Sequence, residues 1–169
     1  MTDRYGDPFR AFYDRALPAV YGYMRTRLSD LSRVEDVTQE VFMAAVKQWP
    51  FPANVRDEVA FVMGIARHKL VDEYRRQDAQ VRRRQQYAAM SGHAAAHRTT
   101  AANEVRVQWA LASVPAMQRA ALVLRHVDDL AVKDVAAVLG KSVRATESLL
   151  ARGTRSLRKS FREVEKTDV

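Results

Sequence analysis

The most constraining feature of this sequence is a pair of helical patterns joined by a short turn, between Leu130 and Arg162. The first pattern places apolar residues at i, i+3, i+4 and i+7, as an amphipathic helix does. Gly140 follows it and is typical of the left-handed residue that ends a helix. Ser142 is typical of the N-cap of a second helix. A short helix, a glycine-containing turn and a longer helix together predict a helix-turn-helix.

The second predicted helix has two different sides. One stripe, which we expect to pack inward, carries Thr146, Leu150, Gly153 and Leu157. The opposite side carries Arg144, Ser148, Arg152, Arg155 and Lys159. Arginine on an exposed helix can reach guanine edges and phosphates in the major groove of DNA. An ordinary amphipathic helix with a solvated basic side would show the same pattern, but the helix-turn-helix context favours DNA binding.

The charge of the chain also indicates a polyanionic partner. Its 169 residues include 28 Lys and Arg against 20 Asp and Glu, a formal net charge of +8. Nucleic acid is the first expectation, and an acidic membrane surface is the second. The chain has no cysteine, which excludes disulfides, thiolate metal sites and cysteine catalysis. No segment approaches the roughly 20 apolar residues that span a bilayer, so we expect a cytoplasmic protein without membrane insertion.

Helical periodicity extends through most of the chain, without strand-like alternation, and predicts an all-α fold. Residues 7–28 predict two consecutive helices, with Pro18 in the first turn of the second. Ser32 is expected to cap the next helix, with Glu35 completing a capping box. One side of that helix carries Asp36, Gln39, Glu40 and Met43. The acidic residues here either complement the helix dipole or form a docking surface for a basic partner.

Two prolines between Trp49 and Arg56 require a loop after this helix. Its aromatic residues could grip a flipped base or pack into the core. A long helix is expected next, from about Val55 to Gln86. Cations with an aromatic residue among them are typical of single-strand nucleic-acid binding. Those on the outward side of this helix are Arg67, Lys69, Arg75 and Arg76, with Tyr74 among them.

The apolar period is lost after this helix, which indicates a flexible linker between two small helical domains. We expect domains at residues 1–80 and 103–169, joined by a linker at 81–102; the second domain contains the helix-turn-helix. His93 and His97 have the spacing of a metal pair on a helix, but no acidic residue lies between them. No nucleophile is found with a base and an orienting group. We therefore predict no catalytic site, no metal and no cofactor.

Four segments resemble the extracytoplasmic-function (ECF) group of bacterial RNA polymerase sigma factors, in the sigma-70 family. EDVTQEVF at residues 35–42 is similar to region 2.2, and AFVMGIARHKLVDEYRR at residues 60–76 is similar to regions 2.3 and 2.4. SVPAMQRAALVLRHVDDL at residues 113–130 is similar to region 4.1, and residues 130–159 are similar to region 4.2. Each motif alone is moderately specific, whereas their order and spacing together are highly specific.

The resemblance implies a promoter-specific transcription initiation factor, not an enzyme, that directs core RNA polymerase to promoter DNA. The implied contacts with the polymerase are the clamp helices of the largest subunit and, for the C-terminal domain, the flap of the second-largest subunit. The residues implied in clamp docking are Asp36, Gln39, Glu40 and Met43. Those implied at the −10 element are Trp49, Phe51, Asn54, Arg56, Phe61, Arg67, His68, Lys69, Tyr74, Arg75 and Arg76. Those implied at the −35 element are Ser142, Arg144, Thr146, Glu147, Ser148, Arg152, Arg155 and Lys159.

The chain departs from the family pattern at several positions that concern DNA. Phe61 stands where the family usually has Trp, and His68 replaces the common Asn. Glu147 and Leu149 stand where basic residues are frequent, which weakens or reorients the expected −35 contacts. An anti-sigma factor is a further candidate partner, since many family members are held by one. The alternative function is a free-standing helix-turn-helix regulator that does not bind core polymerase.

Overall fold

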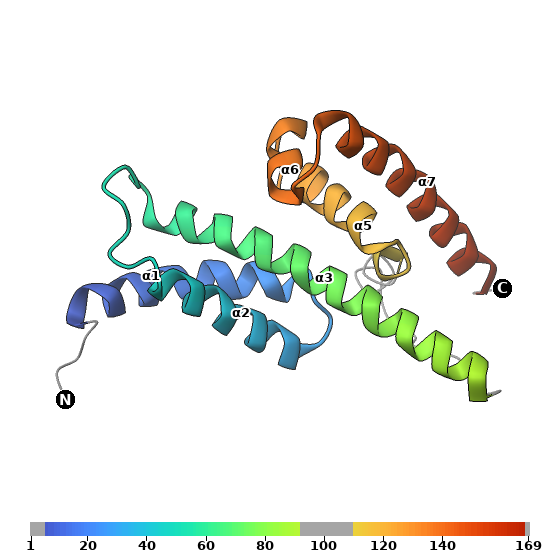
Figure 1. Cartoon of the computed structure of the whole chain (residues 1–169), viewed down its shortest axis with the longest axis horizontal. Coiled ribbons are helices and arrows are strands. Elements are labelled where there is room, and N and C mark those ends of the chain that lie inside the picture. Colours follow the sequence, from blue (N-terminus) through green and yellow to red (C-terminus); the bar gives the residue numbers. More distant parts are fainter. Residues whose placement is uncertain (1–5, 92–109, 168–169) are drawn as a thin grey trace. The chain divides into compact units, whose positions relative to one another are not determined.

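The computed structural model describes residues 6–91 and 110–167, and these residues form helices joined by turns, with no strand. The helices are α1 (Gly6–Arg25), α2 (Leu31–Val46), α3 (Glu58–Ser91), α5 (Ala116–Leu122), α6 (Val132–Leu139) and α7 (Val143–Thr167) (Figure 1). A π-helical segment, Val123–Val127, continues α5. The all-α prediction is confirmed. His93, His97 and the second half of the predicted linker, residues 92–102, lie outside the described residues. The first half, residues 81–91, is not a linker but the end of α3.

The chain divides into two compact units, residues 1–70 and 71–169, and the boundary falls inside α3. In the first unit, α1 and α2 form an antiparallel pair, and the first part of α3 lies beside them (Figure 1). Aliphatic residues from all three helices and the ring of Phe12 fill this core. Its fully or almost fully buried members include Phe12, Val20, Met24, Val34, Val37, Val41, Val62, Ala66 and Leu70.

The prediction of two helices at residues 7–28 is wrong, because α1 continues through Pro18. A proline inside a helix removes one backbone hydrogen bond to the preceding turn. Pro18 is exposed, so the freed carbonyl of Asp14 is on the solvent side, where water can satisfy it. Ala16 and Val20, on the inward side, are fully buried and hold both halves of the helix against the core.

The helix starts after α1 also differ from the sequence prediction. Asp30, and not Ser32, is the N-cap of α2, and its Oδ1 accepts a hydrogen bond from the Ser32 amide at 2.9 Å. At α3, Asp57 Oδ1 accepts from the Ala60 amide at 2.9 Å, so this helix begins three residues later than Val55. Aspartate and serine are about equally good N-caps. Sequence alone therefore could not choose between them.

The second unit contains the predicted helix-turn-helix, α6 and α7. Gly140 ends α6 with φ 62° and ψ 40°, the left-handed conformation that its position predicted. Ser142 Oγ accepts from the Ala145 amide at 3.2 Å, so the predicted cap at the start of α7 is confirmed. The predicted inward stripe of α7 faces the core, with Thr146 and Gly153 buried and Leu150 and Leu157 half-buried. At Gly153, α7 approaches α5 so closely that a β-carbon would lie 3.1 Å from the Leu122 side chain.

Candidate functional surfaces

The outer side of α2 forms the first candidate surface. Asp36, Gln39 and Met43 are exposed, and the Met43 side chain stands out with 62% of its area accessible. Glu40 is half-buried beside them. These residues line one open depression together with Arg33, Ala44, Lys47 and Lys69. The structure therefore places all four predicted docking residues on one surface.

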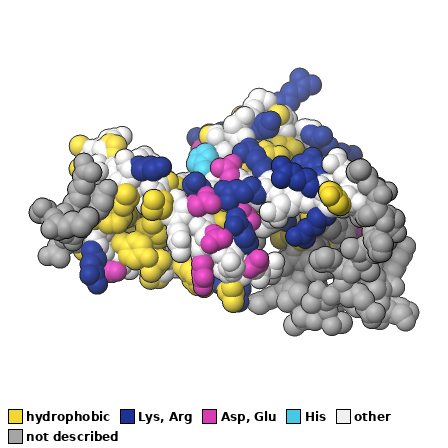
Figure 2. Space-filling view, turned by 60° about the horizontal axis from the view of Figure 1, so that its bottom comes forward, with side chains coloured by type: hydrophobic (Ala, Val, Ile, Leu, Met, Phe, Trp, Pro, Cys, Tyr) yellow, Lys and Arg dark blue, Asp and Glu magenta, His cyan; other side chains and the backbone are white. Residues whose placement is uncertain are grey.

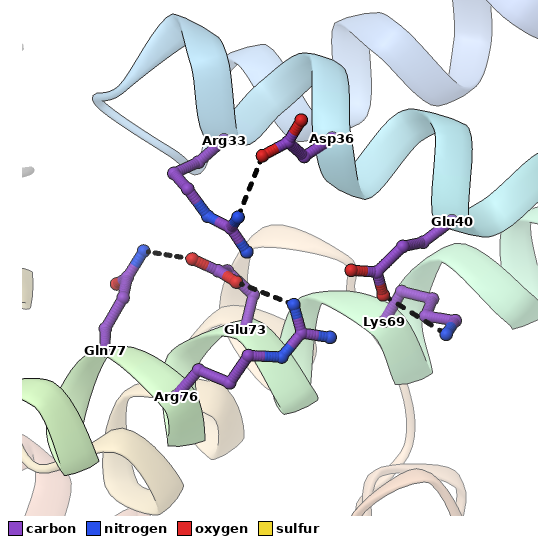
Figure 3. A network of polar contacts seen from close by, with 7 residues as sticks. All are labelled: Arg33, Asp36, Glu40, Lys69, Glu73, Arg76 and Gln77. Atoms are coloured by element: carbon purple, nitrogen blue, oxygen red, sulfur yellow. Dashed lines mark hydrogen bonds and ion pairs between the residues drawn. The ribbon is translucent and has the colours of Figure 1, made fainter.

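The acidic groups of this surface are not isolated. Arg33 Nη1 lies 2.9 Å from Asp36 Oδ2, and Lys69 Nζ lies 3.3 Å from Glu40 Oε2 (Figure 3). The face drawn in Figure 2 shows acidic side chains gathered in its middle, with Lys and Arg close by. Exposed and half-exposed ion pairs contribute about 0–1 kcal/mol each. Both carboxylates can therefore exchange their own cations for those of a partner at little cost.

The loop between α2 and α3 resolves one alternative that the sequence left open. Trp49 and Phe51 are half-buried and pack on the core, with ring centroids 5.4 Å apart for Trp49 and Phe12 and 4.9 Å apart for Phe51 and Phe61. The rings therefore anchor the loop in this structure. Asn54 and Arg56 are exposed and are among the polar residues that this loop presents to solvent.

The predicted −10 residues of α3 differ widely in exposure. His68, Arg75 and Arg76 are exposed, whereas Arg67 and Lys69 are half-buried. Arg76 Nη1 lies 3.4 Å from Glu73 Oε2, and Glu73 also accepts a hydrogen bond from Gln77 Nε2 at 3.0 Å (Figure 3). Tyr74 was expected to lie among these cations as a stacking group. It is only 2% exposed, which leaves no ring face for a base in this conformation.

The ring of Tyr74 is covered by an arginine that the sequence analysis missed. The guanidinium of Arg119, on α5, lies 4.2 Å from the Tyr74 ring centroid, and its Nη2 lies 3.7 Å from Asp78 Oδ1. Burial lowers the pKa of Arg119 from its usual value, and the nearby Tyr74, Asp78 and Glu73 offset part of that shift. Asp78 also accepts a hydrogen bond from the Ala116 amide at the start of α5. The sequence did contain one sign that Arg119 is buried, because it lies between Ala116 and Ala120 on the buried stripe of α5.

The outer side of α7 forms the second candidate surface, and its predicted members are exposed. They are Arg144, Glu147, Ser148, Arg152, Arg155 and Lys159. Lys159 lies 3.8 Å from Glu163, and Arg152 Nε donates to the Ser148 carbonyl at 3.3 Å. Thr146 is fully buried, and its Oγ1 donates to the Ser142 carbonyl at 3.0 Å. Thr146 therefore packs the helix-turn-helix and has no free surface for DNA here.

Two other kinds of site were sought in the described part of the chain. No three His, Asp or Glu residues there lie close enough together to hold a metal ion. None of the described helices combines the length and the apolar character that crossing a membrane requires.

Known proteins match this chain over most of its length. Residues 12–80 match sigma-70 region 2, and residues 105–157 match sigma-70 region 4. The ECF RNA polymerase sigma factor SigK of Mycolicibacterium vanbaalenii is 27% identical over 165 residues, which cover 94% of this chain and 84% of that protein. SigK of Mycobacterium sp. strain KMS is 25% identical over 164 residues, which cover 94% and 85%.

A solved structure shows the same fold. The sigma factor RpoE of Bartonella quintana, crystallised with the anti-sigma factor NepR, superposes with a TM-score of 0.58 over 91% of this chain and 96% of that one, at 21% identity. A helical unit that is followed along the chain by a helix-turn-helix, together with matches to sigma-70 regions 2 and 4, defines the class as a DNA-binding transcription initiation factor. The chain belongs to the ECF group of the sigma-70 family of RNA polymerase sigma factors. It is a promoter-specific initiation factor that binds core RNA polymerase and directs it to −10 and −35 elements; members of this family are not enzymes.

Proposed function

We propose that this sigma factor docks on the clamp helices of the polymerase largest subunit through the outer side of α2. The side chains that touch the polymerase are Asp36, Gln39, Glu40 and Met43. Their support is the open depression that they line and the exposed Met43, a flexible apolar side chain suited to a partner surface. Complementary charge speeds association and excludes wrong partners.

We further propose that the two DNA elements are read by different segments of the chain. The loop after α2 and the exposed cations of α3 serve the −10 element, and α7 reads the −35 element. The observation that carries this assignment is the outer side of α7, where Arg144, Ser148 and Arg152 lie exposed opposite the buried Thr146 and Gly153. The N-terminal part of such a helix is the part that enters the major groove.

Two further partners belong to this proposal. The C-terminal unit contacts the flap of the second-largest polymerase subunit. An anti-sigma factor holds the protein when it is inactive, which is supported by the anti-sigma factor bound to the RpoE of similar fold. All of these interactions take place in the cytoplasm, where the polymerase works.

The docking assignment is tested by reversing two charges on α2. We expect Asp36→Arg with Glu40→Arg to weaken binding to core polymerase by at least about 100-fold, because paired interfacial charges that are broken cost roughly 2–5 kcal/mol. A titration of labelled sigma factor with core polymerase measures the change. The matched control reverses two exposed acids elsewhere, Asp14→Arg with Glu163→Arg, and should bind as the wild type does.

Both variants should keep the wild-type circular dichroism and melting temperature, since exposed substitutions usually change stability by less than about 0.5 kcal/mol. Unchanged core affinity in the folded α2 variant would remove the docking assignment. Equal losses in both variants would show that overall charge, and not this surface, determines binding.

A further inference from the structure

Helix α5 covers α3 at two of the residues that were expected to meet the −10 element. The Arg119 guanidinium lies 4.2 Å from the centroid of the Tyr74 ring, and that ring is only 2% exposed. Beside it, Arg75 Nε donates to Met117 Sδ at 3.3 Å. All four residues belong to the second compact unit, residues 71–169. In this structure, therefore, α5 takes the place that DNA would need.

A single carboxylate on α3 holds the start of α5. Asp78 accepts a hydrogen bond from the Ala116 amide through Oδ2, and its Oδ1 lies 3.7 Å from Arg119 Nη2. The first amides of a helix have no partner inside the helix. Pro115, at the N-cap of α5, supplies no side-chain acceptor for them. Asp78 is therefore both the cap of α5 and the counter-ion of Arg119.

Arg119 is not fully satisfied in this position. Its side chain is buried, yet its Nε has no hydrogen-bond partner within the described part of the chain. A buried donor without a partner retains its desolvation penalty. The contact between α5 and α3 is therefore weaker than its buried area suggests, and a competing partner can open it.

Helix α5 does not depend on α3 for its own packing. It lies against α6 and α7, with Leu122 close to Gly153. Ser156 Oγ, on α7, donates to Gln118 Oε1 at 2.8 Å. The helix-turn-helix therefore keeps these contacts when α5 leaves α3, so the contact can open without unfolding α5.

We propose that α5 is an autoinhibitory cover, which keeps the Tyr74 ring from stacking on an unpaired base of the −10 element while Asp78 and Arg119 join α5 to α3. Rings among cations are the usual platform for single-stranded bases. When polymerase and promoter DNA are bound, the cover is open and the ring is free. A ligand opens it by binding the open state better than the closed one. This inference rests on the proposed function of α3 at the −10 element.

Reversible cross-linking of the full chain tests the cover, because the protein has no cysteine of its own. Asp78→Cys with Ala116→Cys joins α3 to α5 by a disulfide. Gln118→Cys with Ser156→Cys is the matched control, which joins α5 to α7 and leaves α3 free. Holoenzyme made with each protein is titrated with a labelled single strand that carries the −10 sequence selected by the wild type.

The oxidised α3–α5 pair should bind this strand at least about 10-fold more weakly than its reduced form, because the open state is no longer accessible. The control pair should bind equally in both forms. Loss of core binding in place of strand binding would overturn the inference, since the block would then lie at docking. It is also overturned if only the control pair forms a disulfide, or if the oxidised α3–α5 pair binds the strand normally.

Two substitutions connect the effect to the ring. Tyr74→Leu keeps an apolar side chain without a flat face, and should weaken binding of the strand to holoenzyme by roughly 5- to 150-fold, the range of one base–ring stack. Arg119→Met removes the cation of the cover. The free full-length variant should bind the strand about 10-fold more tightly than the free wild type, because more of it is open. No gain in the folded variant would mean that Arg119 does not close the cover.

The proposed function can fail separately from this inference. If Arg75→Ala with Arg76→Ala weakens binding of the strand to holoenzyme but Tyr74→Leu does not, α3 serves the −10 element and the cover is wrong. If neither variant changes the affinity, the assignment of α3 to the −10 element is wrong as well.

Discussion

The two units hold their proposed DNA-binding segments in place by different kinds of packing. The first unit anchors an irregular loop with large rings, and Phe12 lies at the centre of this cluster, with ring contacts to Phe9, Phe42, Trp49 and Phe51. The second unit fixes a helix by close approach over small residues, with Gly153 against Leu122. Its buried residues include many alanines: Ala110, Ala116, Ala120, Ala121 and Ala136.

The difference follows from what each surface has to do. A loop has no internal hydrogen-bond ladder to hold its shape, so side-chain packing has to fix it, and aromatic rings supply large contact areas with few rotatable bonds. A recognition helix holds its own shape and needs only a defined position, which small residues provide by letting two helices lie close together. Substitutions should therefore harm the first unit when they remove volume and the second when they add it.

The largest effect is expected from removing volume in the first unit. Phe12→Ala should lower the free energy of unfolding by about 3–5 kcal/mol, because Phe12 is fully buried and the rings of the loop rest on it. Chemical denaturation monitored by tryptophan fluorescence measures this change, since Trp49 contacts Phe12. If the free energy of unfolding fell by less than about 1 kcal/mol, the packing of the other rings would not depend on Phe12.

Adding volume to the second unit should have the next largest effect. Gly153→Val should cost about 1–3 kcal/mol, because its side chain would meet Leu122 and the Gln118 carbonyl, both near 3.1–3.2 Å from a β-carbon. A shift of the thermal unfolding curve measures the loss. Gly64→Val is the control for helix propensity, since no atom lies within 4 Å of a β-carbon there. Equal losses at both glycines would contradict a specific close approach at Gly153.

On the outer side of α7 the expected effects concern DNA and not stability. Arg144 is nearest the start of the helix, so Arg144→Ala should reduce discrimination at one −35 position by about 1–3 kcal/mol. Arg155→Ala, further along, should weaken binding to all sequences alike. Holoenzyme affinities for single-base −35 variants distinguish the two. If Arg144→Ala protein ranks the single-base −35 variants by affinity in the same order as the wild type, Arg144 does not read a base, and Glu147 or Ser148 reads it instead.

The smallest effect on stability is expected in the loop after α2. Asn54 is exposed, so Asn54→Ala should change the free energy of unfolding by less than about 0.5 kcal/mol. It should still change the preferred −10 base, because a base that leaves the stack needs a polar group to receive it. Selection from randomised −10 libraries measures the preference. The same preference in the variant would leave this loop with a structural role alone.

The hydrophobic periodicity and the residues typical of helix ends correctly predicted the features that depend on residues close together in the sequence. They gave the all-α fold, the turn at Gly140, the cap at Ser142 and the two sides of α7, because each follows from local geometry. The continuation of α1 through Pro18 was not predictable in this way, since it depends on the buried Ala16 and Val20 beside it.

Contacts between residues far apart in the sequence explain the remaining differences. Trp49 and Phe51 were equally compatible with an exposed and a packed loop until their neighbours Phe12 and Phe61 were placed. Tyr74 looked like a stacking group beside two arginines, but a third arginine, 45 positions later, covers its ring. No local pattern in the sequence records that pairing.

The central claim is that α2 docks on polymerase, that the loop after α2 and helix α3 read the −10 element, and that α7 reads the −35 element. Run-off transcription with core polymerase, on promoters selected from a random pool, tests this claim most directly. The wild type should yield specific transcripts from promoters with two conserved elements. Asp36→Arg with Glu40→Arg should abolish them, and Arg144→Ala should relax only the −35 element. Specific transcripts from the α2 variant, or selected promoters with a single conserved element, would contradict the account.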